Sequence, residues 1–205
     1  MHDAALTDAG RAVFAQLHHF DQYYLAGGTA LALQLGHRQS VDFDCFTDAA
    51  IPKALLRQVE TAFSGTSVVP FVNNGDELSV AVGGVRLSFV RYPFPVLRPF
   101  AVLGDVRALG VLELAATKAY TIGRRGSLKD YVDVHAVLRG GHATLRDIIA
   151  LAEEKYGEVF NGRLFLEQLV YLDDVEDEPI RFLGHPVART DLASFFERAV
   201  RTIGL

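Results

Sequence analysis

The sequence has a single cysteine, Cys45, so it cannot form an internal disulfide. Such sparse cysteine is typical of a reducing compartment. No run approaches the ~20 apolar residues of a membrane-spanning helix. Residues 1–11 also lack the basic and then apolar order of a signal peptide. The sequence therefore predicts a cytoplasmic protein without a membrane partner.

The sequence also has fewer basic than acidic residues. The chain carries 20 Lys and Arg against 25 Asp and Glu, which gives a net charge of −5. The overall field therefore does not attract nucleic acid. RNA binding would need a local basic patch, and Arg124, Arg125 and Lys129 form the best candidate. Internal repeats and low-complexity segments are also lacking.

What is present is a folded chain of 205 residues, of which 50% are hydrophobic and 22% are charged. This length suits one domain, or a compact domain with an appendage. Cys45 lies between Asp44 and Phe46 in an apolar segment. A buried thiol is therefore favoured over a nucleophile.

The hydrophobic pattern predicts an α/β (α+β) fold with a mixed sheet in front and an all-helical rear. Residues 1–108 are expected to form the α/β domain, and residues 109–205 a helical domain that completes the cleft. Three prolines in residues 92–99 exclude a central strand there. The expected helices are 3–20, 52–63, 111–122, 128–138, 144–156, 161–172 and 190–203, and the expected strands include 67–72 and a hairpin of 78–82 and 85–90 around Gly83-Gly84.

Residues 23–47 carry the most informative pattern, YYLAGGTALALQLGHRQSVDFDCFT. Asp42 and Asp44 are two apart in a predicted strand, so their side chains leave on the same face. Paired carboxylates repel each other unless a cation lies between them, and Mg²⁺ prefers oxygen ligands. The alternative is that both aspartates are solvated surface residues.

Upstream, Gly27, Gly28 and Thr29 precede an apolar helical segment. Backbone N–H groups at a helix start, together with a hydroxyl, can bind phosphate. The alternative is an ordinary turn with a threonine cap. A phosphate site beside a metal site would suit phosphoryl or nucleotidyl transfer.

Two features of the rear half have alternative interpretations. Lys118 lies among small apolar residues, so it either extends to solvent or faces a cleft with its charge paired. Asp130 and Asp133 are three apart on one predicted helix face, where they may simply complement the helix dipole. Arg124 or Arg125 could reach a triphosphate, because guanidinium groups suit phosphate oxygens.

Taken together, these motifs resemble a known family. Gly28-Thr29, twelve residues and then Asp42-Phe43-Asp44 resemble the Gly-Ser/Thr and Asp-x-Asp signature of nucleotidyltransferases. The fuller string, with Lys118 and residues 124–133, is similar to the AbiEii-type toxins of type IV toxin–antitoxin systems. Together these motifs cover most of the chain.

The resemblance implies a nucleotidyltransferase that moves a nucleoside monophosphate from an NTP to a hydroxyl of RNA, such as tRNA, or of a protein. An antitoxin partner is also implied. Mg²⁺ (or Mn²⁺) would bind Asp42 and Asp44. Lys118 would neutralise phosphate charge, and Asp130, or else Asp133, would act on the acceptor hydroxyl. The residues expected at the phosphates are Gly27, Gly28, Thr29, His37, Arg38, Ser40, Arg124, Arg125 and Lys129.

One departure from the superfamily pattern concerns the third metal carboxylate, which many of these enzymes hold on a later strand. The corresponding segment, residues 85–90, contains no acid. Asp130 could substitute for it, or activity could be weak or lost. Two further hypotheses are therefore a binding protein that holds nucleotide or antitoxin without turnover, and a metal-dependent phosphohydrolase. The base of the NTP, the acceptor and the oligomeric state cannot be inferred from the sequence.

Overall fold

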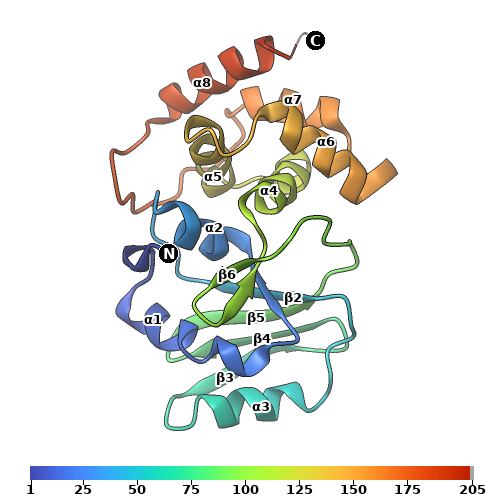
Figure 1. The fold of residues 1–205 in the computed structure, drawn as a ribbon. Helices are drawn as coiled ribbons and strands as arrows, with labels where there is room; N and C mark the ends of the chain where they lie inside the picture. The colour runs from blue at the N-terminus through green and yellow to red at the C-terminus, as the bar shows by residue number, and fades with distance from the viewer. Residues whose placement is uncertain (204–205) are drawn as a thin grey trace.

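A seven-stranded mixed sheet forms the N-terminal half of the protein (Figure 1). The computed structural model describes residues 1–203, and its strand order is β3-β4-β5-β2-β1-β7-β6. Strand β1 pairs antiparallel with β2 and parallel with β7, and β2 pairs parallel with β5, which confirms the predicted mixed sheet. The strands are β1 (Tyr24–Ala26), β2 (Phe43–Thr47), β3 (Val68–Asn73), β4 (Glu77–Val82), β5 (Val85–Arg91), β6 (Ala101–Leu103) and β7 (Val106–Ala108).

The helices of the C-terminal half lie together at one end of the sheet (Figure 1). Helix α2 lies between the two halves and packs against both α4 and α5. The α-helices are α1 (Asp8–Phe14), α2 (Gly27–Leu35), α3 (Leu55–Ala62), α4 (Val111–Arg125), α5 (Leu128–Arg139), α6 (Leu145–Tyr156), α7 (Gly162–Val170) and α8 (Arg189–Arg201), and the 3₁₀ segments are η1 (Asp3–Ala5), η2 (Leu17–Phe20) and η3 (Gly157–Val159).

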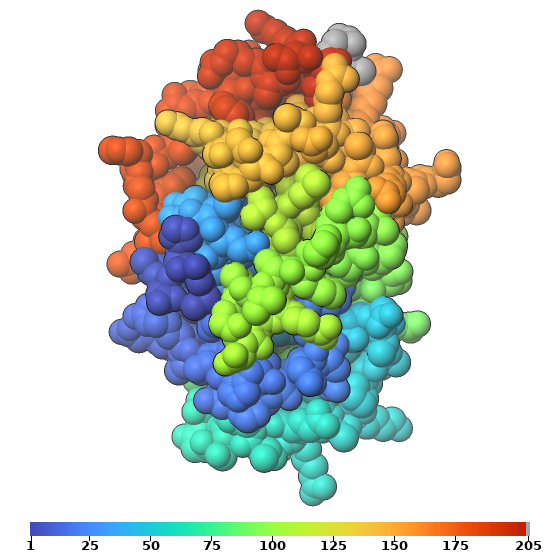
Figure 2. Space-filling view, in the orientation of Figure 1, coloured from blue at the N-terminus to red at the C-terminus, as the bar shows by residue number. Residues whose placement is uncertain are grey.

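One hydrophobic core runs through both halves. It includes Leu25 and Phe43 of the sheet, Leu31 of α2, and Val134 of α5, each fully buried. In the space-filling view the two halves of the chain pack directly against each other (Figure 2). The position of residues on α2 is therefore fixed from the sheet side and from the helical side together.

One sequence prediction about the elements is wrong, and one hairpin was missed. The single helix expected over residues 3–20 is instead three short segments, because Thr7 begins a new helix by accepting a hydrogen bond from the Gly10 N–H. The short hairpin of β6 and β7 was not predicted, since each strand has only three residues. The glycine hairpin is as expected, with φ of 55° at Gly83 and 86° at Gly84.

The proline-rich segment 92–99 forms no strand and is attached to the helical half. Glu113 of α4 accepts hydrogen bonds from the backbone N–H groups of Leu97 and Arg98. Lys155 of α6 pairs with Glu113 at 2.6 Å and donates to the Pro95 carbonyl at 2.8 Å. Separately, no helix within residues 1–203 is both long and apolar enough to cross a membrane.

Candidate active site

The start of α2 lies directly beside the carboxylate of Asp44. The antiparallel register of β1 and β2 sets Ala26 opposite Asp44, and α2 begins at the next residue, Gly27. Gly27 has a φ of +65°, and a Cβ at this position would overlap Asp44 Oδ2. Glycine is therefore required twice over, by the backbone conformation and by the closeness of the carboxylate.

Gly28 allows a second close approach, since a Cβ there would overlap the guanidinium of Arg38. The next residue, Thr29, is 1% exposed; its hydroxyl donates a hydrogen bond to the Asp42 carbonyl and lies 2.8 Å from Ser40 Oγ, whose own hydroxyl can donate to it. The Thr29 hydroxyl therefore fixes the segment before β2, and its predicted place at a phosphate has no support in this geometry. The predicted glycine turn is in fact the first turn of α2.

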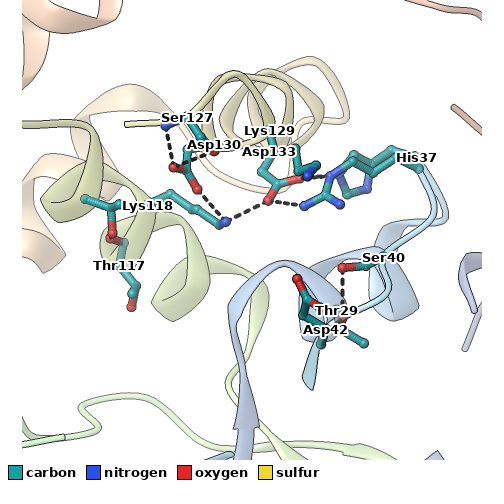
Figure 3. Close-up of polar contacts among 12 residues, drawn as sticks. Thr29, His37, Ser40, Asp42, Thr117, Lys118, Ser127, Lys129, Asp130 and Asp133 are labelled. Carbon is teal, nitrogen blue, oxygen red and sulfur yellow. Dashed lines mark hydrogen bonds and ion pairs between the residues drawn. The ribbon is translucent and has the colours of Figure 1, made fainter. Parts of the chain in front are cut away.

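The ammonium group of Lys118 lies between two carboxylates of α5 (Figure 3). Its Nζ atom is 2.6 Å from Asp130 Oδ1 and 2.9 Å from Asp133 Oδ2. Of the two sequence interpretations of Lys118, the paired one is therefore observed. Burial alone would lower the pKa of Lys118, but Asp133 and Asp130 outweigh burial and raise it, so the side chain stays charged.

Asp130 has two sets of partners because of its position at the helix start. Its Oδ2 atom accepts hydrogen bonds from the backbone N–H and the hydroxyl of Ser127, which forms a capping box. Its Oδ1 atom accepts from Lys118. The helix cap therefore also orients the ammonium group.

Asp133, the second choice in the sequence analysis, is the buried centre of this network. It is fully buried and accepts hydrogen bonds from Arg38 at 2.7 and 2.9 Å, and it contacts His37 Nε2 at 2.7 Å. Burial alone would raise the pKa of Asp133, but Lys118, Arg38 and these hydrogen bonds hold it well below its usual value. Arg38 is thus committed to Asp133.

Some of these groups line one cavity of about 450 Å³, whereas Gly27, Thr29 and Asp133 are not among its lining residues. Asp42 and Asp44 of the sheet region lie in its wall together with Lys118 and Asp130 of the helical half. Asp42 and Lys118 appear on opposite sides of this space in Figure 3. Further lining residues that the sequence also singled out are Gly28, Arg38, Ser40 and Lys129.

The ionised form of Asp44 is disfavoured in this cavity. Burial raises its pKa, Lys118 acts to lower it, and Asp42 raises it further. Among residues 1–203, no hydrogen-bond donor is directed at the carboxylate of either Asp42 or Asp44, whereas Asp130 and Asp133 are both satisfied. A bound cation would relieve this cost.

These two carboxylates fit a divalent cation with few protein ligands. No group of three or more His, Cys, Asp or Glu within residues 1–203 is placed to bind a metal. The β5 residue opposite Asp44 is Ser88, which is 1% exposed, so the absent third carboxylate is replaced by a buried hydroxyl. Mg²⁺ suits such a pair, since it keeps several waters and takes its remaining ligands from substrate phosphates.

Some expected site residues lie elsewhere. Neither Arg124 nor Arg125 lines the cavity. The Arg124 guanidinium donates to the Val159 carbonyl at 2.7 Å and lies 4.3 Å from the Tyr120 ring centre. His37 lies behind the cavity wall, at Asp133.

Arg181 lines the same cavity and was missed by the sequence analysis. It belongs to the long connection between α7 and α8, which has no periodic pattern. This connection is held along residues 37–39 by backbone hydrogen bonds, from the Gln39 N–H to the Arg181 carbonyl and from the Leu183 N–H to the His37 carbonyl. No sequence signal could have found this pairing.

Residues 11–203 match the model of the family described as nucleotidyl transferase AbiEii toxin, type IV toxin–antitoxin system. The chain belongs to the AbiEii nucleotidyltransferase toxin family. The predicted resemblance is thereby confirmed, and nucleotidyl transfer is the general activity of this enzyme.

Individual proteins similar to this AbiEii protein include one sequence relative and two solved structures. An uncharacterized protein of Aquifex aeolicus (strain VF5) is 31% identical over 163 residues, which are 77% of each chain. A solved H. pylori protein proposed to be a nucleotidyltransferase matches with a TM-score of 0.65 and 18% identity, over 99% of this chain and 96% of that one. The MenT4 nucleotidyltransferase toxin of Mycobacterium tuberculosis H37Rv matches with a TM-score of 0.60 and 16% identity, over 94% and 82%. The last two likenesses confirm the nucleotidyltransferase fold.

Proposed function

We propose that the cavity between β2, α4 and α5 binds an NTP with Mg²⁺ and transfers its nucleoside monophosphate to a hydroxyl acceptor. One observation carries the proposal: Asp42 and Asp44 share this cavity with Lys118 and Asp130, although about 75 residues of sequence separate the two pairs. Carboxylates without donors beside a lysine suit the binding of a metal and a phosphate.

The charges around the cavity support a metal requirement. Its cationic lining residues are Arg38, Lys118, Lys129 and Arg181. Three of them are already paired with carboxylates, Arg38 and Lys118 with Asp133 and Lys129 with Glu178. Since Asp42 and Asp44 add further negative charge, a triphosphate would meet no net positive field without a cation. Mg²⁺ held by Asp42 and Asp44 would supply that charge and polarise the phosphates.

Each of the following cavity residues would then have a defined role in the reaction. Gly28 and Ser40 would face the phosphates, and Arg181, whose side chain makes no ion pair within residues 1–203, would bind the triphosphate. Lys118 would neutralise charge that develops at the α-phosphate or the leaving pyrophosphate. Asp130 would orient the acceptor hydroxyl or take its proton.

Label transfer tests this proposal directly. The protein is incubated with Mg²⁺, each of the four NTPs labelled at the α-phosphate, and either total tRNA or candidate proteins. We expect covalent label on one acceptor class, and a loss of at least about 100-fold in Asp44→Asn and Lys118→Met. Asp105→Asn, in the exposed turn between β6 and β7, is the matched control and should retain full transfer.

The two remaining hypotheses both predict no label transfer, and each predicts a different result in a second measurement. Ser88 at the position of a third carboxylate favours a catalytically weak binding protein. That hypothesis would show NTP binding by calorimetry without transfer to any acceptor. A phosphohydrolase would instead release phosphate from γ-labelled NTP in the absence of an acceptor. Either result would overturn transfer as the reaction of this site.

The setting of the reaction is also part of the proposal. Membership of a type IV toxin–antitoxin family supports an antitoxin encoded beside this chain. The acceptor is RNA or protein, and Lys129, a cation of the cavity lining, would face it. The cytoplasmic location stays a prediction from the sequence.

A further inference from the structure

A second cavity, of about 470 Å³, lies on another side of α5. It is lined by His37, His135, His142, His185 and Arg139, which means that four of the seven histidines of the chain face one space. We call it the histidine cavity. The remainder of its wall is largely apolar, with Leu35, Val132, Phe182 and Val187 among the lining residues.

Two histidines of the histidine cavity have ring nitrogen atoms without protein partners. His37 contacts Asp133 through Nε2, while its Nδ1 atom is buried and has no hydrogen-bond partner within residues 1–203. His135 is only 5% exposed, its ring packs 4.6 Å from that of Phe195, and its ring makes no hydrogen bond to these residues. A buried nitrogen without a partner is costly unless a ligand or water satisfies it, and both residues line this cavity.

All polar side chains in the wall of the histidine cavity are imidazole or guanidinium groups. Imidazole and guanidinium groups can donate hydrogen bonds, and no carboxylate is among the described residues that line the cavity. Arg139 lies in the last turn of α5. Burial lowers the pKa of His135, and Arg139 and His37 lower it further against the opposing effect of Asp191 of α8, so this ring is neutral near pH 7. The wall therefore offers one fixed positive charge, that of Arg139, beside imidazole N–H donors, which suits an anion.

We propose that the histidine cavity is a second ligand site, which binds a small organic anion with an apolar or aromatic body. The anionic group would lie against Arg139 and the imidazoles of His135 and His185. The apolar body would lie against Val132 and Phe182. The volume is within the range of about 300–1,000 Å³ that small-molecule sites occupy.

This site is distinct from the nucleotide cavity, although the two share a wall. Gly36 and His37 face the histidine cavity, while Arg38 and Gln39 face the other. The connection between α7 and α8 is divided in the same way, with Arg181 in one lining and Phe182 in the other. Binding here can therefore be measured without reference to nucleotidyl transfer.

A pair of fluorescent probes tests the proposal on the intact chain. Anilinonaphthalene sulfonate is an aromatic anion, and N-phenylnaphthylamine is its neutral counterpart. We expect one equivalent of the anion to bind, at least about tenfold more tightly than the neutral probe. Equal affinities would overturn the anionic ligand class.

Histidine NMR then locates the probe. In proton–carbon correlation spectra, the ring signals of His135, His142 and His185 should shift with the anion, while those of His18 and His19 should not. Shifts at His18 and His19 alone, or at no histidine, would overturn the site.

Two variants away from the nucleotide cavity complete the test. Arg139→Gln should weaken binding of the anion about tenfold and leave the neutral probe unaffected. Gly184→Trp should block both probes, because Gly184 lines the cavity and an added Cβ there meets no atom within 4 Å. Unfolding midpoints like that of the unmodified protein establish that both variants are folded. Unchanged binding of the anion in both variants would contradict the proposal.

Discussion

Arg38 binds Asp133 with two hydrogen bonds, from Nε to Oδ1 at 2.7 Å and from Nη2 to Oδ2 at 2.9 Å. The two residues are 95 positions apart, and both are buried. Arg38 lies just before the metal-binding aspartates proposed above, and Asp133 lies on α5 beside Lys118. Their contact therefore sets the spacing between the sheet side and the helical side of the cavity.

Replacing Asp133 should destabilise the fold strongly. Asp133→Asn leaves Arg38 and Lys118 buried without their shared counter-charge, and loss of one partner of a buried pair costs about 3–5 kcal/mol. Urea unfolding at neutral pH measures this change. Asp173→Asn, at an exposed position, serves as the control and should differ from the unmodified protein by less than about 0.5 kcal/mol.

The same variant predicts a pH dependence. Because the pKa of Asp133 is held well below its ordinary value of 3.8, its stabilisation is complete above about pH 3.8 and is lost as pH falls through the lowered pKa. The stability difference between the unmodified protein and Asp133→Asn should thus be constant from neutral pH down to about pH 4 and shrink below that. A difference that already falls between pH 7 and pH 5 would contradict the assignment.

Alanine substitutions at two glycines distinguish the cost of positive φ from the cost of overlap with the Asp44 carboxylate. Gly27→Ala and Gly104→Ala both introduce a side chain at positive φ, +65° and +59°, at a cost of about 1–2 kcal/mol. At Gly104 an added Cβ meets no atom within 4 Å, whereas at Gly27 it overlaps Asp44. Gly27→Ala should therefore cost more stability than Gly104→Ala and should also weaken Mg²⁺-dependent NTP binding. Equal effects on both quantities would show that Asp44 tolerates the displacement.

Asp44→Asn should raise stability while it removes function. Burial first, and Asp42 in addition, raise the pKa of Asp44, so its ionised form is disfavoured in the fold. This cost appears as pH rises from the unfolded value of 3.8 toward the raised pKa. The variant should therefore have a higher thermal unfolding midpoint at pH 7, and the gain should vanish below about pH 3.8.

Mg²⁺ provides the complementary measurement for Asp44. Saturating Mg²⁺ with NTP should raise the unfolding midpoint of the unmodified protein, because ligand binding to the folded state stabilises it. The midpoint of Asp44→Asn should be insensitive to the same addition. A similar shift in both proteins would place the cation elsewhere.

Lys155 and Glu113 form a second fully buried pair, which holds the proline-rich segment against the helices. Lys155→Met alone should destabilise the protein by about 3–5 kcal/mol, because it leaves the Glu113 carboxylate buried without its counter-charge. The double variant Lys155→Met with Glu113→Gln should recover at least about 1 kcal/mol of that loss. Additive losses in urea unfolding would show that the two side chains act independently.

Local sequence was sufficient for most elements of this fold. Helix α6 begins where Thr144 and Asp147 form a capping box, and the β4–β5 hairpin turns at two adjacent glycines. Such signals act within a few residues, so they can be identified without knowledge of the rest of the chain. Prediction failed for the three-residue strands β6 and β7, because β7 forms by pairing with β1, and β6 by pairing with β7, rather than through local propensity.

By itself, the sequence determined that Asp42 and Asp44 stand two residues apart at the start of β2, with Asp42 just before the strand, and that Asp130 lies in the first turn of α5, since local patterns specify both elements. Tertiary structure alone decided that Asp133 would be the buried partner of Arg38 and that Arg181 would enter the same cavity as Gly28. These partners are far apart in the chain. Their meeting depends on how α2, α5 and the connection before α8 pack, which no local pattern specifies.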